Sequence, residues 1–348
     1  MFDINTLLRK NIKNLTPYSS ARDEFQGEAS VFLDANENAF GSPLPAAYNR
    51  YPDPMQHAIK SRLKEIKGLP VRNIFVGNGS DEAIDILFRS FCNPGVDNVI
   101  IVPPTYGMYQ VSANINDIET KKVLLTDEYQ LNLEGIAEAI DEHTKLIFIC
   151  SPNNPTGNSI NREDIETLLA NFNGIVVVDE AYINFSRQKS FIQELTEYAN
   201  LVVMQTLSKA WGLAGLRVGM AFASEEIIEV MNRVKPPYNV NEASQQLALQ
   251  ALQNVQQVND WIKETLIQRD KLVLTLKKMD FVLDIYPSDA NFVLVKTTNA
   301  TGIYNYLVDK GIIVRNRTNV ELCEGCLRIT IGTPEENNTL LSTLQQYK

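Results

Sequence analysis

Short apolar, β-branched runs alternate with helix-like segments between about residue 70 and residue 225. Several of these runs are apolar at every position, as strands are when helices cover both faces of a sheet. The segments between them begin with helix-start signals, such as Ser80 before two carboxylates and Asn161 at the head of NREDIETLLANF. We therefore predict a mainly parallel α/β sheet. The predicted strands are 73–76, 98–102, 145–150, 174–179, 201–205 and 217–223.

A second alternation follows residue 241, where a long helical stretch precedes shorter strand patterns at 290–296, 312–316 and 327–332. This pattern predicts a smaller α+β domain. The first 40 residues contain no complete core pattern of their own, so we expect them to join that smaller domain. The expected division is an N-terminal arm that forms part of the small domain (1–40), a large ligand-binding domain (41–245) and a C-terminal small domain (246–348).

Charge and hydropathy exclude several classes of partner. The 348 residues carry a formal net charge of −10, which argues against a general nucleic-acid or anionic-membrane surface. Any anion site must therefore be local. The first residues lack the apolar region of a signal peptide, and no run reaches the roughly 18 apolar residues of a membrane span. We expect a cytoplasmic protein with no nucleic-acid or membrane partner.

Cysteine and histidine are too scarce for a disulfide scaffold or a histidine triad. The only close cysteine pair is CEGC at 323–326, which has no second pair to complete a zinc site, and we interpret it as structural. His57 and His143 lie in polar, surface-like sequence. We therefore expect no metal centre. The four cysteines are Cys92, Cys150, Cys323 and Cys326.

Polar or glycine-rich segments follow five of the predicted strands. Because ligands of parallel α/β sheets collect at the carboxyl ends of the strands, we expect these segments to meet at one edge. The first is a glycine-rich turn that enters a helix, where backbone amides and the helix dipole favour a phosphate. The segments are GNGSDEA (77–83), PPTYGMY (103–109), SPNNPTGN (151–158), DEAY (179–182) and TLSKAWGLAGLR (206–217).

Together these segments suit pyridoxal phosphate, a planar, phosphorylated aromatic aldehyde. Lys209 would bond to the aldehyde carbon, which needs an amine kept reactive in a dry, cation-rich pocket. Asp179 would pair with the protonated ring nitrogen. Asn154 and Tyr182 would hydrogen-bond the ring hydroxyl, and Tyr106 would stack on the ring. Each segment alone is also explained as an ordinary turn or strand end, but all five in order favour the cofactor.

The cofactor phosphate would be held where the first and last of these segments meet. We expect contributions from backbone amides at the helix start and from hydroxyl and guanidinium groups. The predicted phosphate ligands are Ser80 and Asp81 through their amides, and Thr206, Ser208 and Arg217 through their side chains.

Three segments, SPNNPTG, VVDEAY and TLSKAWGLAGLR, resemble those of fold-type I pyridoxal-phosphate-dependent aminotransferases. This resemblance implies a mainly parallel seven-stranded sheet in the large domain, a smaller α+β domain and pyridoxal phosphate as cofactor. Over nearly its whole length, the chain further resembles the histidinol-phosphate aminotransferase branch. That narrower likeness rests on LTPYSSAR (15–22), LDANENAFGSP (33–43), RYPDP (50–54), GNGSDE (77–82), PTYGMY (104–109), KPPYNVN (235–241) and CLRITIGTPEE (326–336).

The branch implies transfer of an amino group between L-histidinol phosphate and 2-oxoglutarate in histidine biosynthesis, with Lys209 moving the proton. Tyr51 would reach the cofactor phosphate of a neighbouring subunit, which implies a homodimer with shared sites. Arg328 would bind the phosphate of histidinol phosphate and, in the return half-reaction, the carboxylate of glutamate. The other substrate-binding residues that the resemblance implies are Tyr18, Asn154, Tyr238 and Arg315.

Three alternatives stay open at this point. The same fold acts on aromatic amino acids, in which case Arg328 would bind a carboxylate. Threonine-phosphate decarboxylases share the scaffold and would release carbon dioxide without a keto acid. A pyridoxal-phosphate-binding regulator is disfavoured, because the sequence contains no helix-turn-helix extension and no basic face.

Overall fold

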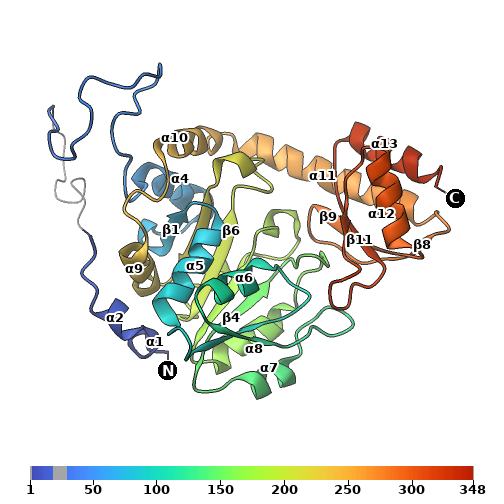
Figure 1. Ribbon diagram of the computed structural model, residues 1–348, viewed down its shortest axis with the longest axis horizontal. Helices are drawn as coiled ribbons and strands as arrows, with labels where there is room; N and C mark the ends of the chain where they lie inside the picture. The colour runs from blue at the N-terminus through green and yellow to red at the C-terminus, as the bar shows by residue number, and fades with distance from the viewer. Residues whose placement is uncertain (1, 19–29, 348) are drawn as a thin grey trace.

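The computed structural model describes residues 2–18 and 30–347, which form a larger and a smaller lobe side by side (Figure 1). The larger lobe is built on a seven-stranded sheet with the order β1-β7-β6-β5-β4-β2-β3. Only β7 runs antiparallel to its neighbours, so the predicted mainly parallel sheet is confirmed. Its strands are β1 (Ile74–Gly77), β2 (Asn98–Ile101), β3 (Glu119–Lys122), β4 (Thr144–Cys150), β5 (Ile175–Asp179), β6 (Leu201–Thr206) and β7 (Gly219–Ala223).

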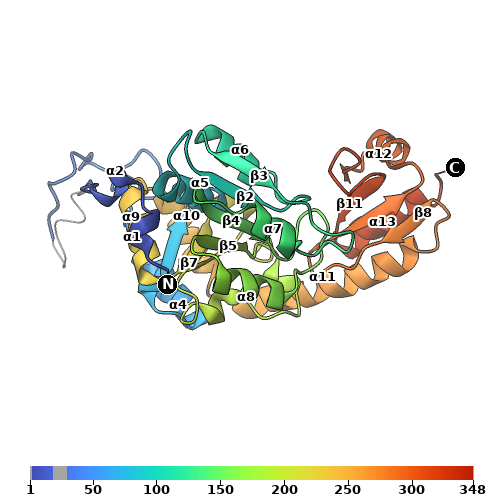
Figure 2. The same cartoon turned by 90° about the horizontal axis from the view of Figure 1, so that it is seen from below.

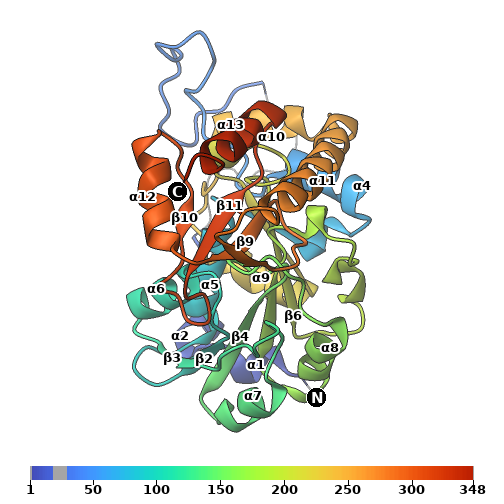
Figure 3. The same cartoon turned by 90° about the vertical axis from the view of Figure 1, so that its right-hand side faces the viewer.

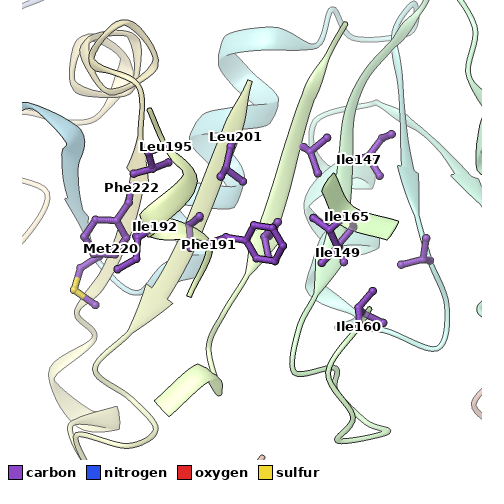
Figure 4. Close-up of a cluster of buried hydrophobic side chains, with 14 of the residues drawn as sticks. Ile147, Ile149, Ile160, Ile165, Phe191, Ile192, Leu195, Leu201, Met220 and Phe222 are labelled. Atoms are coloured by element: carbon purple, nitrogen blue, oxygen red, sulfur yellow. The ribbon is translucent and has the colours of Figure 1, made fainter. Parts of the chain in front are cut away.

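Helices cover both faces of this sheet, which explains why its central strands are apolar throughout. In β5, Val176 and Val178 pack into one cluster, while Ile175 and Val177 pack into another on the opposite face. Figure 4 shows part of the first cluster, where Ile147 and Ile149 of β4 lie near Ile165. The first face carries α4 (His57–Lys67), α7 (Leu133–Ala139), α8 (Arg162–Asn171) and α10 (Glu242–Ala251). The second carries α1 (Ile4–Leu7), α2 (Lys10–Lys13), α5 (Ser80–Phe91), α6 (Met108–Ile115) and α9 (Glu225–Val234).

The smaller lobe is an antiparallel sheet with helices on one face. Its strand order is β10-β11-β9-β8, and Figure 3 views it end-on with α12 and α13 beside β9 and β11. Leu327 and Ile329 of β11 pack against these helices, so strand alternation turns Arg328 toward the opposite face. The elements are α11 (Val255–Leu276), β8 (Val282–Ile285), β9 (Phe292–Thr297), α12 (Ala300–Asp309), β10 (Arg315–Asn316), β11 (Cys326–Thr330) and α13 (Pro334–Leu344).

The structure corrects our expectation for the N-terminal arm. Ile4, Leu7 and Ile12 pack into the cluster formed by α5 and the large sheet, and the Arg9 amide donates to the carbonyl of Ser90 at 3.1 Å. The described start of the chain therefore joins the large lobe rather than the small one. Residues 19–22 of LTPYSSAR lie outside the described residues.

The expected continuous helix after residue 241 is two helices, α10 and α11, which meet at 252–254. Ala248, Leu252 and also Val258 in the first part of α11 pack in the large-lobe cluster, whereas Leu272 and Leu276 near the end of α11 pack with the small sheet (Figure 2). The expected domain limit at 245 falls inside α10, so we now propose that the lobes divide at this break. The helix cap at Ser80 is also corrected, because Gly79 occupies the N-cap and Ser80 is the first helical residue.

No helix in the described part of the chain is long and apolar enough to cross a membrane. All four cysteines are free and buried, and Cys323 and Cys326 belong to the apolar cluster of the first sheet face. The side chains of His57 and His143 are exposed, as predicted.

Candidate active site

A cavity of about 660 Å³ opens where the carboxyl ends of the large-lobe strands face β10 and β11 of the small lobe. Strand register explains the convergence, because Gly77 at the end of β1 and Thr206 at the end of β6 both pair with Gly219. Twelve predicted site residues line the cavity: Ser80, Asp81, Tyr106, Asn154, Asp179, Tyr182, Thr206, Ser208, Lys209, Arg217, Arg315 and Arg328.

One end of the cavity is an anion cradle at the start of α5. Gly79 has a φ of +81°, and a Cβ at this position would lie 2.6 Å from Nη2 of Arg217. A Cβ on Gly219 would collide with the backbone nitrogen of Ser80. Glycine at both positions therefore lets the Arg217 guanidinium and the first amides of α5 approach one another.

Hydroxyl groups from the loop after β6 lie at the same edge. The Thr206 hydroxyl accepts a hydrogen bond from the Ser208 amide at 3.1 Å, which tightens the turn that leads to Lys209. Nη2 of Arg217 pairs with Oδ2 of Asp81 at 3.1 Å. Hydroxyls, helix amides and a guanidinium are the donor set that phosphate prefers.

Asp179 lies at the floor of the cavity and is 3% exposed. Burial raises its pKa from 3.8 to about 6, although the carboxylate accepts hydrogen bonds from the Tyr109 hydroxyl at 2.7 Å and the Ala181 amide at 3.1 Å. A cation beside this carboxylate would restore its ionised form. Sequence reasoning missed Tyr109, which is fully buried.

Lys209 extends into the cavity from the loop after β6, and its Nζ lies 5.6 Å from the centre of the Tyr182 ring. Partial burial, and then the positive charge of Arg328, lower the pKa of Lys209. The lysine is nevertheless exposed, because the cavity is open, so the pocket is less dry than we expected. A lowered pKa increases the fraction of neutral amine, the form that attacks an aldehyde.

Two predicted ring-binding tyrosines flank this floor. The Tyr106 hydroxyl donates to Oδ1 of Asp81 at 3.1 Å, and its ring packs edge-on against Tyr109. Tyr182 is 7% exposed and packs edge-on against Phe292 of β9. Both tyrosines belong to the large lobe, and Tyr182 connects the cavity floor to the small lobe through its contact with Phe292.

The opposite end of the cavity carries arginines from the small lobe. Nη1 of Arg328 donates a short hydrogen bond to Oδ1 of Asn154, which connects the two lobes. Arg315 lies directly opposite Arg328 in the β10-β11 pair. Arg317 also lines the cavity, although we did not predict it as a site residue.

Three predicted residues lie elsewhere within this chain. Tyr51 and Tyr238 stack with ring centres 4.4 Å apart in a second pocket, and Tyr18 has 74% of its surface exposed. None of the three lines the cavity that contains Lys209. A single described chain therefore does not bring them to Arg328.

The large-lobe residues fit pyridoxal phosphate on chemical grounds. Lys209 offers the amine for the aldehyde, Asp179 offers a buried acceptor for the ring nitrogen, and the glycine-lined start of α5 offers a phosphate cradle. Each group lies at the edge where the strand-end argument placed it. The lining of the cavity thus supplies a partner for the aldehyde, the ring nitrogen and the phosphate of the cofactor.

Residues 38–344 match the model of the family described as aminotransferase class I and II. A histidinol-phosphate aminotransferase of Parabacteroides distasonis is 54% identical over 348 residues, with 100% of both chains covered. One of Cytophaga hutchinsonii is 52% identical over 346 residues, with 99% of each chain covered.

Solved structures show the same fold. The histidinol-phosphate aminotransferase of Clostridium acetobutylicum superimposes with a TM-score of 0.79 at 23% identity, over 86% of this chain and 90% of that one. The enzyme of the same name from Sinorhizobium meliloti, in complex with pyridoxal-5'-phosphate, gives a TM-score of 0.78 at 23% identity, over 89% and 88%.

Proposed function

The chain belongs to the class I and II aminotransferases, which depend on pyridoxal phosphate, and from that premise we propose that it transaminates L-histidinol phosphate with 2-oxoglutarate. The products would be imidazole-acetol phosphate and L-glutamate, in histidine biosynthesis. The observation that carries the proposal is one cavity with cationic groups at both ends: Arg217 at the start of α5 and Arg328 on the small lobe. Two ends suit two phosphates, one of the cofactor and one of the substrate.

We assign the large-lobe residues to the cofactor. When bound, pyridoxal phosphate supplies a reactive aldehyde and a ring that accepts the electron pair of the substrate carbon. Asp179 would hold the proton of the ring nitrogen, and Asn154 and Tyr182 would orient the ring through its hydroxyl. Tyr106 would support the ring face. The phosphate would be held by the amides of Ser80 and Asp81 with Thr206, Ser208 and Arg217.

Proton transfer at the substrate carbon would fall to Lys209. Its Nζ extends into the cavity between the two cationic ends, and its pKa is lowered, which favours the neutral amine, the form that can accept a proton. Arg328 would hold the substrate anion and thereby keep the reacting carbon beside Lys209. The planar guanidinium can bind either the phosphate of histidinol phosphate or a carboxylate of glutamate.

A half-reaction tests this proposal. Histidinol phosphate added to the purified holoenzyme should convert the aldehyde absorption of the cofactor to that of its amine form. Lys209→Ala should abolish the conversion, because Lys209 is the lining lysine whose charge acts on Asp179, whereas Lys122, the other lysine of the lining, lies at the end of the edge strand β3. Lys263→Ala, at an exposed lysine on α11, is the matched control and should behave as wild type.

The outcomes separate the candidate functions. Normal turnover by Lys209→Ala would show that Lys209 does not transfer the proton. A spectral change with phenylalanine but none with histidinol phosphate would instead support an aromatic aminotransferase. Carbon dioxide release without a keto acid would support a decarboxylase.

We also propose a cytoplasmic homodimer with shared active sites. Large apolar side chains on the described N-terminal part of the chain are exposed, which a partner subunit would cover. Tyr51 and Tyr238 lie beside this segment, outside the Lys209 cavity. Four free thiols fit a reducing compartment. The exposed apolar residues are Leu15, Tyr18, Val31, Leu33, Phe40, Leu44, Tyr48 and Tyr51.

A further inference from the structure

Three arginines from one hairpin of the small lobe face the same cavity. Arg315 pairs with Arg328 across β10 and β11, and Arg317 follows directly after β10. The Arg317 amide donates to the carbonyl of Cys326 at 2.8 Å, so the backbone of the hairpin fixes its position. All three side chains line the substrate end of the cavity.

Arg317 differs from its neighbour Arg328 in having no hydrogen-bond partner for its side chain among the described residues. Arg328 donates to Asn154 and lies 5.2 Å from the centre of the Phe292 ring. The buried Nε of both arginines has no hydrogen-bond partner, but the guanidinium of Arg328 has Asn154 as a partner, whereas that of Arg317 has none and forms no ion pair with a carboxylate in the described part of the chain. A buried donor without an acceptor is costly, so a ligand that supplies the acceptor gains binding energy.

The three guanidinium groups are all positively charged and repel one another. Burial, followed by the positive charges of Arg328 and Arg315, lowers the pKa of Arg317. Exposed Glu321 also lines the cavity but forms no ion pair with these arginines in the described residues. A carboxylate neutralises one of three positive charges, whereas a phosphate monoester carries about −1.5 to −2 at pH 7 and offers three acceptor oxygens.

We propose that Arg317 is a specificity-determining residue that favours a dianionic phosphate over a carboxylate at the substrate end of the cavity. This inference rests on the proposed function, because it assigns Arg317 to the histidinol phosphate half-reaction. Arg328 binds the anionic group of both substrates. Arg317 adds a second cationic contact, which a phosphate dianion can satisfy and a carboxylate cannot. The enzyme can thus bind two different anions at one site and still hold the phosphate more tightly.

The test compares the two half-reactions in Arg317→Gln, Arg317→Lys and the wild type. For Arg317→Gln we expect KM for histidinol phosphate to rise roughly 10- to 100-fold, the usual effect of losing a charged hydrogen bond, with kcat changed by less than about threefold. KM for glutamate should change by less than about threefold. Arg317→Lys should recover part of the loss, since it keeps the charge without the planar fork.

A pH series adds a readout that a structural role would not change. The wild type should bind histidinol phosphate more tightly as pH rises through about 6, where the phosphate becomes a dianion. Arg317→Gln should show a weaker dependence over this range. Arg72→Gln is the control, because Arg72 is an exposed arginine paired with Glu225 outside the cavity.

Each outcome has a distinct meaning. Glutamate turnover by Arg317→Gln shows that the variant is folded. An equal increase in KM for glutamate and for histidinol phosphate would overturn the role of Arg317. An unchanged KM for histidinol phosphate would do the same. A wild-type enzyme that reacts with glutamate but not with histidinol phosphate would instead refute the proposed function.

Discussion

The buried carboxyl of Asp179 connects cofactor binding to the stability of the protein. Its pKa is raised from 3.8 to about 6 by burial, so the folded protein retains a proton between these values that the unfolded chain has lost. Without a cation beside it, the ionised carboxylate therefore destabilises the fold progressively as pH rises through this window. A pKa shift of about two units corresponds to roughly 3 kcal/mol in the free energy of unfolding.

Asp179→Asn should make the cofactor-free protein more stable at pH 7 and flatten the dependence of its unfolding free energy between pH 4 and pH 6. Urea denaturation of the cofactor-free protein across this range measures both effects. Asp260→Asn, at an exposed carboxylate on α11, should leave the pH dependence unchanged. A steeper or identical profile in Asp179→Asn would contradict the assigned cost of burial. The same variant should lose activity with the cofactor present, because the ring nitrogen loses its carboxylate partner.

Single residues in the cavity were predictable where the sequence carries a local pattern. Asp179 ends an apolar strand, Lys209 and Asn154 lie within four residues after one, and strand ends meet at one edge of a parallel sheet. Tyr109 was missed because its contact with Asp179 spans 70 positions and depends on how α6 packs. Arg317 was missed because only the β10-β11 hairpin turns it inward.

Among the elements, the start of α5 places the strictest demand on residue type. Gly79→Ala should weaken binding of pyridoxal phosphate by roughly tenfold or more, because strain at positive φ and the clash with Arg217 together exceed about 1.4 kcal/mol. Equilibrium dialysis of the cofactor measures the change. Gly68→Ala is the matched control, since Gly68 has a φ of +72° but no atom lies within 4 Å of the position that an alanine methyl group would take. Equal weakening in both variants would show that backbone strain, rather than the cradle, is responsible.

The buried strands were predicted because apolar residues at every position have few other uses. Two of the four edge strands, β3 and β8, were not predicted, since β3 reads ETKK and β8 exposes two of its four residues. Polar edges protect a sheet from further pairing but remove the hydrophobic signal. The break between α10 and α11 contains neither glycine nor proline, and its one helix-start residue, Asn254 at the N-cap of α11, makes no side-chain cap hydrogen bond.

At the scale of the whole molecule, the separation of Tyr51 from Lys209 within one chain makes the homodimer testable. Lys209→Ala and Tyr51→Ala should each be nearly inactive alone. Mixing them under conditions that exchange subunits should restore about a quarter of wild-type activity, because half of the dimers are hybrids with one intact site each. No recovery despite proven exchange, with both variants folded, would show that the sites are not shared.

The crowding of guanidinium groups in one cavity of an acidic protein has a kinetic consequence. With a net charge of −10, the molecule repels an anionic substrate from afar and attracts it only close to Arg317 and Arg328. At an ionic strength of 0.1 M, counterions screen forces beyond about 10 Å, while close contacts inside the cavity are screened much less. Moderate salt should therefore raise the association rate of both anionic substrates. In enzymes that attract their substrates electrostatically over a long range, salt instead lowers this rate.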